Sequence, residues 1–573
     1  MEEIQSKLKA IIKKLFEIEV EPEVVLAVGK KMSDGRGMDF ATNAAMRLTR
    51  ELKKNPLEIA EAIKQEFEKG NTEVIVEVAK PGFLNFMLRD EYWKGKLADL
   101  GTDFEKNISC SEYSGQTVVC EFSDPNPFKV LHVGHLYTSI VGDAISRLIE
   151  FAGGKVVRAN FGGDVGLHVA KTIYEMKRRK NDLFGENLEK WNALTVAEKS
   201  EKMAECYVAG TQDYEDDDQA RKEIVELNKK IYEITTKNER ASEIAQIYWL
   251  GRETSYAYFE EFYVRMGVKF DKYYPESTVA DKGLRIVKEQ LKNGVYEESD
   301  GAVVFKGEKY GLHTRVFINK EGLPTYETKD VGLIFAKWED YQFDKSVIIT
   351  GNDIVDYMKV VLASISEYKP KLAERTLHLT HGNVRLPGNE KMSSRKGNFL
   401  KAVDVLAMIE EALSKQHNNL DKKVAMGATK YVFLKYKMGG NIEFSVDDSV
   451  SMTGNSGPYL QYAAVRAKKI LAGTLKDGVS EGDGTWKLNE FEKELIKKVV
   501  QYREIVAVAV REAAPHKVCE YLYELAQTFS RFYENVKVVG SEYEKERGEI
   551  VLAYLKTLTH GLKILGIEVP ERM

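Results

Sequence analysis

Two segments of the chain combine residue types that can stabilise negative charge as it develops. The first is Lys129–His135, in which His132 and His135 flank Gly134. Glycine lets a ligand approach the backbone, and imidazoles can donate hydrogen bonds or bind a metal ion. Two other interpretations stay open here: a pair of surface histidines at helical spacing, or half of a zinc site. No cysteine or second histidine pair lies nearby to complete a metal shell.

The second segment is Gly388–Gly397, which reads GNEKMSSRKG and gathers cations, hydroxyls and glycines. Such a loop can bind phosphate oxygens, although a run of charges is more often a solvated surface.

The first segment lies where a predicted strand gives way to a predicted helix. Apolar residues predict a buried strand over Thr117–Phe122, an apolar-striped helix over Gly134–Phe151 and a second strand near Val156–Ala159. This is the β-α-β unit that opens a doubly wound parallel sheet. Ligands of such sheets bind beyond the carboxyl ends of the strands, where helix N-termini favour anions.

Together, HVGH and KMSSRKG resemble the HIGH and KMSKS signatures of class I aminoacyl-tRNA synthetases. The resemblance implies a Rossmann-like α/β catalytic domain that uses ATP, with Mg²⁺ carried on the phosphates and no dedicated protein metal site. It implies catalytic roles for Lys129, His132, His135 and Lys391. It implies ATP contacts for His132, Gly134, His135, Gly163, Asp164, Lys391, Met392, Ser393 and Lys396.

Two details of this site leave room for interpretation. Ser394 stands where KMSKS has its second lysine, so Lys391 is expected to carry most of the role and Lys396 less. The segment Phe161–Gly166, FGGDVG, could instead form a plain tight turn.

Residues 1–110 are expected to form a separate α+β domain. Helices are predicted over Glu2–Glu17, Thr42–Leu52 and Pro56–Glu68, and a strand over Val74–Val78. FATN at 40–43 and PGFLNF at 81–86 resemble the additional domain of arginyl-tRNA synthetases, which recognises the tRNA D-loop. The resemblance places Phe83 and Asn85 on tRNA; the alternative is that Phe83 and Phe86 pack in the core of a β-sheet.

The catalytic domain is expected over residues 111–405, with a mostly helical insertion at about 171–262, strands within 301–316 and a buried strand over 346–351. Residues 406–573 are expected to form an all-α bundle. Its helices are predicted over 425–436, 457–471, 490–511, 515–533 and 546–565.

The start and the end of this bundle resemble the anticodon-binding domain of arginyl-tRNA synthetases. NSGPYLQY at 455–462 and the terminal PERM carry the likeness, which implies tRNA contacts for Tyr459, Tyr462, Arg466 and Met573. Exposed aromatics can stack on unpaired bases. The alternative is that these tyrosines belong to an ordinary helix-packing face.

Selection of arginine would require acceptors for a planar, permanently charged guanidinium. By the resemblance, Glu121 and Asp330 hold the guanidinium, Tyr326 packs on it and Asn126 holds the α-amino group. The alternatives are an edge-strand carboxylate for Glu121 and a helix cap for Asp330. The family often has a glutamine after the strand near Thr350 to help hold the amino group. This chain has none there, and Asp353 or Asp356 could substitute.

Composition limits the remaining possibilities. The chain has 573 residues, 43% of them hydrophobic and 30% charged, and a net charge of −5, so any tRNA binding must use local patches. No apolar run could span a membrane, the N-terminus lacks a signal-peptide core and the four cysteines are scattered. We expect a cytoplasmic monomer that binds ATP, arginine and tRNA(Arg). A class I synthetase for another amino acid, or a tRNA-binding paralogue without catalysis, would be the alternatives.

Overall fold

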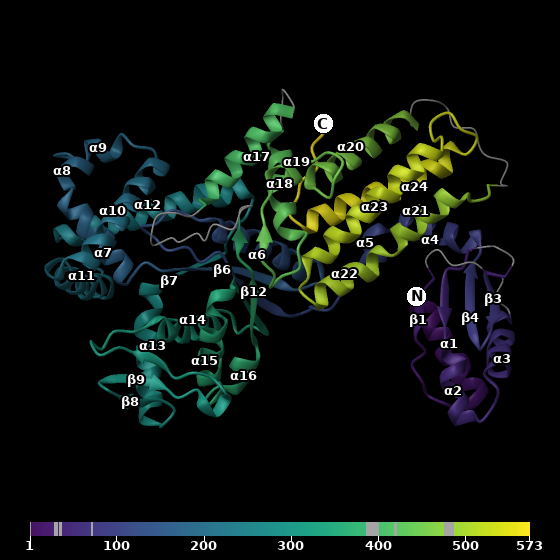
Figure 1. Cartoon of the computed structure of the whole chain (residues 1–573), viewed down its shortest axis with the longest axis horizontal. Coiled ribbons are helices and arrows are strands. Elements are labelled where there is room, and N and C mark those ends of the chain that lie inside the picture. Colours follow the sequence, from purple (N-terminus) through teal and green to yellow (C-terminus); the bar gives the residue numbers. More distant parts are fainter. Residues whose placement is uncertain are drawn as a thin grey trace. The chain divides into compact units, whose positions relative to one another are not determined.

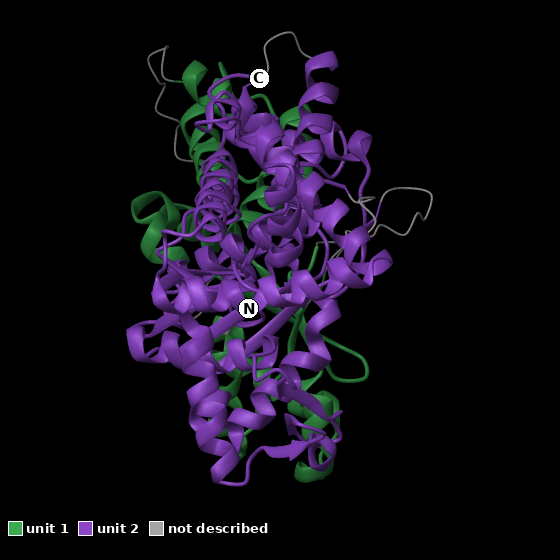
Figure 2. Ribbon diagram, turned by 90° about the vertical axis from the view of Figure 1, so that its left-hand side faces the viewer, with its two compact units in different colours: residues 1–108, 467–501, 527–556 green, residues 109–466, 502–526, 557–573 purple. Residues whose placement is uncertain are grey.

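The computed structural model describes residues 2–27, 32–33, 37–69, 73–385, 400–416, 421–474 and 486–573. The chain folds into two compact units (Figure 2). Unit 1 comprises residues 1–108, 467–501 and 527–556, and unit 2 comprises residues 109–466, 502–526 and 557–573.

The amino-terminal part of unit 1 is an α+β arrangement. Its antiparallel sheet has the order β1-β2-β4-β3, with β1 (Val24–Leu26), β2 (Phe40–Thr42), β3 (Val74–Ala79) and β4 (Phe83–Leu88). Its helices are α1 (Glu2–Phe16), α2 (Ala44–Leu52), α3 (Pro56–Glu68), α4 (Asp90–Thr102) and α5 (Phe104–Ile108). Asn55 starts α3, since its side chain accepts a hydrogen bond from Leu57 N and Pro56 fits the first turn.

Unit 2 is built on a five-stranded parallel sheet of order β12-β11-β5-β6-β7 in the described part of the chain (Figure 1). The strands are β5 (Thr117–Glu121), β6 (Lys155–Gly162), β7 (Lys272–Pro275), β11 (Lys345–Gly351) and β12 (Thr376–His381). The chain moves outward from β5 to β6 and β7, then returns to place β11 on the other side of β5. This switch point opens a crevice at the carboxyl ends of β5 and β11.

Helices connect and flank this sheet. Between β5 and β6 runs α6 (Val133–Phe151). The insertion after β6 contains α7 (Leu167–Arg178), α8 (Lys180–Leu183), α9 (Glu189–Asn192), α10 (Val196–Asp216), α11 (Asp218–Lys237) and α12 (Glu243–Met266). It has its own apolar core, which includes the buried Trp191 and Tyr248.

The segment between β7 and β12 adds a small antiparallel sheet and further helices. The elements are α13 (Glu276–Lys292), β8 (Glu297–Ser299), β9 (Ala302–Phe305), β10 (Arg315–Ile318), α14 (Tyr326–Tyr341), α15 (Val355–Ser366) and α16 (Pro370–Glu374), with 3₁₀ turns at Glu308–Tyr310 and Asn352–Ile354.

The rest of the chain is mostly helical, apart from a short parallel pair formed by β13 (Val384–Arg385) and β14 (Ile442–Glu443). The helices are α17 (Ala402–Gln416), α18 (Lys422–Leu434), α19 (Val446–Val450), α20 (Gly457–Thr474), α21 (Glu490–Val500), α22 (Tyr502–Arg511), α23 (Pro515–Asn535) and α24 (Glu544–Ile564). The division into units falls inside α20, α23 and α24.

The predicted fold class is confirmed: an α/β parallel sheet, an α+β amino-terminal part and a helical carboxyl-terminal part. The prediction of one helix over 490–511 is wrong, because α21 and α22 are separate helices that belong to different units. No glycine or proline near Gln501 signals that break. None of the described helices combines the length and apolarity needed to cross a bilayer.

Candidate active site

The two histidines of HVGH begin α6 by capping each other. His132 is the N-cap residue, and its Nδ1 accepts a hydrogen bond from Gly134 N at 3.1 Å. His135 Nδ1 accepts from His132 N at 3.2 Å, and the two rings stack with centroids 3.8 Å apart. This is a capping box made from imidazoles. Because both Nδ1 atoms act as acceptors, each neutral ring carries its proton on Nε2 and can donate from that atom.

Burial and nearby cations keep both rings neutral. Burial, followed by the ammonium of Lys129, lowers the pKa of His132 to about 4. Burial, followed by His132 and Lys129, holds the pKa of His135 well below its usual value. The pair therefore offers neutral N–H donors at a helix N-terminus, which suits developing charge on phosphate oxygens. Lys129 itself lies over the ring of Tyr207, with Nζ 4.1 Å from the centroid.

The described residues on either side of the second signature contact α6 or the residues that precede it. Residues 386–399, which include Lys391, Met392, Ser393 and Lys396, lie outside the described residues. After them, Leu400 O accepts from Val133 N at 2.8 Å, and Ala402 N donates to Leu131 O at 2.9 Å. The described residues that follow the second signature are thus hydrogen-bonded to both sides of His132.

Before the second signature in the chain, His381 at the end of β12 contacts α6. Its Nε2 lies 2.6 Å from Thr138 Oγ1, and its Nδ1 donates to Gly382 O at 2.9 Å. Neither β12 nor this contact was predicted from the sequence.

Two buried carboxylates lie close enough to influence each other near the carboxyl end of β5. Glu121 ends β5 and is 2% exposed, and Asp330 lies in α14 and is 7% exposed. Burial, followed by Glu121 and Glu276, raises the pKa of Asp330 well above its usual value. A cation that enters between these carboxylates would relieve this cost. Tyr326, one turn before Asp330, is 56% exposed and can cover such a cation.

Two buried lysines that the sequence analysis missed balance part of this charge. Lys337 Nζ donates to Glu121 Oε2 and lies 3.1 Å from Ser346 Oγ. Lys329 Nζ donates to Glu276 Oε2 at 2.5 Å. Both lysines lie on α14, and Lys337 follows Asp330 by two helical turns. Nothing local in the sequence marks Lys337 as the partner of Glu121, which lies 216 residues away.

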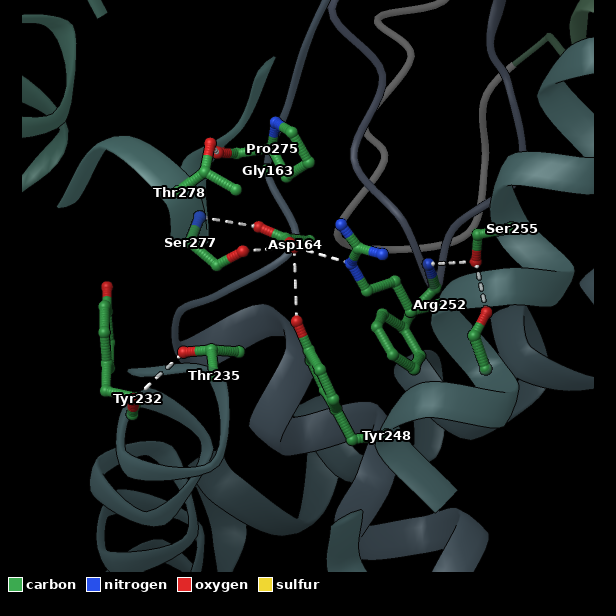
Figure 3. Close-up of polar contacts among 12 residues, drawn as sticks. Gly163, Asp164, Tyr232, Thr235, Tyr248, Arg252, Ser255, Pro275, Ser277 and Thr278 are labelled. Atoms are coloured by element: carbon green, nitrogen blue, oxygen red, sulfur yellow. Dashed lines mark hydrogen bonds and ion pairs between the residues drawn. The ribbon is translucent and has the colours of Figure 1, made fainter. Parts of the chain in front are cut away.

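The FGGDVG segment is fixed by its aspartate, as Figure 3 shows. Asp164 is fully buried. Its carboxylate accepts from Ser277 N at 2.8 Å, Ser277 Oγ at 2.7 Å, Arg252 Nε at 2.7 Å and Tyr248 Oη at 3.2 Å. A Cβ at position 163 would lie 2.1 Å from Asn126 Oδ1, so only glycine allows this approach.

Comparison with known proteins places these features in one family. The family model described as "tRNA synthetases class I (R), catalytic domain" matches residues 103–432, more than half of the chain. "Arginyl tRNA synthetase N terminal domain" matches residues 2–88, and "DALR anticodon binding domain" matches residues 460–573. The chain belongs to the arginyl-tRNA synthetase family.

Individual relatives align over the whole chain. The arginine–tRNA ligase of Shewanella loihica is 30% identical over 100% of this chain and 99% of that protein. The arginine–tRNA ligase of Parabacteroides distasonis is 27% identical over 100% and 99%. The Thermus thermophilus arginyl-tRNA synthetase structure has the same fold, with a TM-score of 0.76 at 22% identity over 100% of both chains.

The two aspartates that could replace the family's glutamine have different surroundings. Asp353 raises the pKa of His132 electrostatically, against the stronger effect of burial, and its Oδ1 lies 2.7 Å from where a Cβ on Gly351 would be. Asp356 is exposed and pairs with Lys359 at 3.2 Å. Both aspartates are exposed, but of the two only Asp353 is close enough to His132 to influence its pKa.

In unit 1, the two residues that the family likeness places on tRNA line a cavity of about 340 Å³. Phe83 is 38% exposed at its rim, whereas Asn85 is 8% exposed. The other described lining residues are Glu23, Val25, Met38, Ala41, Thr42, Asn43 and Ala79. The cavity thus combines an aromatic face with amide groups.

In α20, the three residues predicted to bind tRNA differ in exposure. Tyr462 is 38% exposed, and Tyr459 is partly buried with its ring edge against Tyr523, at 5.6 Å between centroids. Tyr459, Tyr462 and Arg466 recur at helical spacing. Met573 is partly buried at the end of the chain. Among the described residues, no group of three or more His, Cys, Asp or Glu could hold a metal ion.

Proposed function

We infer that the protein is an arginine–tRNA ligase. It activates arginine with ATP to arginyl-adenylate and transfers the arginyl group to the 3′-terminal ribose of tRNA(Arg). In the first step a carboxylate oxygen of arginine attacks the α-phosphorus, and the bond to the bridging oxygen breaks to release pyrophosphate. In the second step a ribose hydroxyl attacks the acyl carbon, and AMP leaves.

One observation carries this inference beyond family membership. Glu121 at the carboxyl end of β5 and Asp330 of α14 form a buried carboxylate pair, and the start of α6, the helix that follows β5 along the chain, carries a stacked pair of neutral imidazoles, His132 and His135. The first pair suits a forked cation, and the second suits phosphate oxygens.

We assign the amino-acid end of the site as follows. Glu121 and Asp330 accept hydrogen bonds from the guanidinium, and Tyr326 packs on its face. Asn126 holds the α-amino group. Asp353 takes the place of the family's glutamine, because it influences His132 electrostatically, whereas Asp356 pairs with Lys359.

We assign the nucleotide end to the two signatures and the glycine turn. His132 and His135 donate to phosphate oxygens, Gly134 gives the nucleotide room, and Lys129 adds positive charge. Gly163 and Asp164 border the nucleotide through their backbone, since the Asp164 carboxylate is already occupied by protein donors. Lys391, Met392, Ser393 and Lys396 complete the assignment by likeness to KMSKS.

Recognition of tRNA is assigned to both ends of the chain. Residues 1–110 bind the D-loop through Phe83 and Asn85. Residues 406–573 bind the anticodon through Tyr459, Tyr462, Arg466 and Met573. An aromatic ring beside an amide suits a nucleobase, which can stack and hydrogen-bond at once. Residues 111–405 act as the catalytic domain.

Mg²⁺ would accompany ATP and bind the phosphates, as expected where protein carboxylates supply few ligands. We propose that the protein works in the cytoplasm as a monomer.

The test is ATP–pyrophosphate exchange with each amino acid, with and without tRNA. Exchange that depends on arginine supports the assignment. Exchange driven by another amino acid would identify a synthetase of different specificity, and tRNA binding without any exchange would identify a non-catalytic paralogue. Either result would refute the proposal.

A further inference from the structure

One face of α12, in the helical insertion, contacts the loops that follow β5 and β6. Tyr248, Arg252 and Tyr256 recur at four-residue spacing, so they share that face. Arg252 stacks between aromatic rings, with Cζ 4.9 Å from the centroid of Tyr256 and 5.4 Å from that of Trp249. These rings therefore help to hold the guanidinium in the position from which it pairs with Asp164.

The first anchor of α12 is the carboxylate of Asp164 (Figure 3). Arg252 supplies one of the four hydrogen bonds to this group and the one positive charge among its hydrogen-bond donors. The other donors are the hydroxyl of Tyr248 and two groups of Ser277 in the first turn of α13. A fully buried carboxylate depends on such a partner, because an unpaired charge in the interior is strongly unfavourable.

The second anchor of α12 lies one turn further along the helix. Ser255 Oγ accepts from Phe128 N at 2.9 Å, and its hydroxyl donates to Gly251 O at 2.8 Å. A Cβ at position 251 would lie 2.3 Å from the ring of Phe128, so the helix and this loop are in close contact.

The two anchors hold the two loops that meet at the amino-acid end of the site. Phe128 belongs to the loop after β5, which carries Asn126. Asp164 follows Gly163, the glycine that approaches Asn126 Oδ1. The relative position of these loops therefore depends on α12, although no side chain of α12 belongs to the assigned arginine site.

We propose that Arg252 is a positioning residue for arginine activation: by pairing with Asp164 it holds the glycine turn against Asn126, and so fixes the amide that orients the α-amino group of the substrate. This inference rests on the proposed function. Through the contact between Arg252 and Asp164, the helical insertion contributes to the geometry of the amino-acid site. Glu276, next to Ser277, pairs with Lys329 beside Asp330, so α13 links the same anchor to the guanidinium slot.

The test compares Arg252→Gln with Arg252→Lys and with Arg240→Gln in the full chain, by ATP–pyrophosphate exchange with tRNA present. Arg240 is the matched control, because its Cζ lies 4.2 Å from the same Trp249 ring but its charge faces Glu253 at 3.5 Å. We expect Arg252→Gln to lower kcat/KM for arginine by about 10- to 100-fold; because Gly163 and Asp164 also border the nucleotide, the KM for ATP should rise too, but by a clearly smaller factor. Arg252→Lys should recover most of that loss, and Arg240→Gln should match the wild type.

A double variant separates positioning from simple destabilisation. If Arg252 acts through Asp164, then Arg252→Gln with Asp164→Asn should be no worse than Arg252→Gln alone. Tyr248→Phe, which removes one donor and no charge, replaces Arg252→Gln if that variant does not fold, and should give a smaller loss that is larger for arginine than for ATP.

The proposal is overturned by unchanged arginine kinetics in Arg252→Gln or Tyr248→Phe, by additive losses in the double variant, or by arginine and ATP parameters that fall together with the melting temperature. Wild-type protein without arginine-dependent exchange would instead refute the proposed function.

Discussion

The ion pair between Lys337 and Glu121 gives a quantitative prediction. Both side chains are almost completely buried, at 0% and 3% exposed. Replacing Lys337 by Met removes the cation, keeps an apolar stem of similar length and leaves the Glu121 carboxylate without its partner. Breaking a buried ion pair in this way lowers the free energy of unfolding by about 3–5 kcal/mol.

The size of unit 2 converts this free energy into a melting temperature. Unit 2 has about 400 residues, which at about 2.1 cal/mol/K per residue gives an unfolding entropy of about 0.8 kcal/mol/K. The melting temperature of the Lys337→Met variant should therefore fall by about 4–6 °C. Circular dichroism on heating measures this change.

Two further variants decide whether the charge is the cause. The double variant Lys337→Met with Glu121→Gln removes both charges and should melt within about 2 °C of the wild type, yet it should not activate arginine. Lys359→Met breaks an exposed pair with Asp356 and should shift the melting temperature by less than about 1 °C. The reasoning fails if Lys337→Met melts like the wild type, or if the double variant is as unstable as the single one.

Three other consequences can be measured. The raised pKa of Asp330 means that its carboxyl group stays protonated to a higher pH than that of an ordinary aspartate. Since the guanidinium needs the ionised form, arginine affinity measured by calorimetry should rise with pH through that pKa and level off above it. An Asp330→Asn variant should bind arginine weakly and without this pH dependence. Because the pKa of His132 is about 4 and that of His135 is lower than usual, nitrogen NMR should show both rings neutral and protonated on Nε2 between about pH 6 and about pH 8. A ring that titrates near its usual pKa would contradict the assignment. The His135→Ala variant should lower the kcat of ATP–pyrophosphate exchange by about 10²–10³-fold. Phe83→Ala should raise the KM for tRNA by about 5- to 150-fold through loss of stacking, with the KM for arginine unchanged, and an unaltered KM for tRNA would remove Phe83 from the tRNA site.

The local pattern around α6 was sufficient to predict the centre of the fold. Apolar periodicity predicted the helix start within one residue of Val133, and strand β5 within one residue of its end at Glu121. These elements are predictable because buried strands and amphipathic helices have characteristic apolar patterns within a few consecutive residues.

The partners of the site residues were not predictable in the same way. Lys337 and Arg252 lie 216 and 88 residues from the carboxylates they neutralise, and nothing local distinguishes them from surface cations. The break between α21 and α22 was also missed: the two helices belong to different units, and no glycine or proline marks the boundary. The residues proposed for the chemistry of the site could be named from the sequence, whereas the charged partners that hold them in place are recognised only in the folded chain.

The most direct test of the central claim is the structure of the protein bound to a stable analogue of arginyl-adenylate. The account predicts the guanidinium within hydrogen-bond distance of both Glu121 and Asp330, the α-amino group at Asn126, and the phosphate-equivalent oxygens at Nε2 of His132 and His135. An analogue bound with its guanidinium away from these carboxylates, or with its phosphate-equivalent group in another cavity, would contradict it.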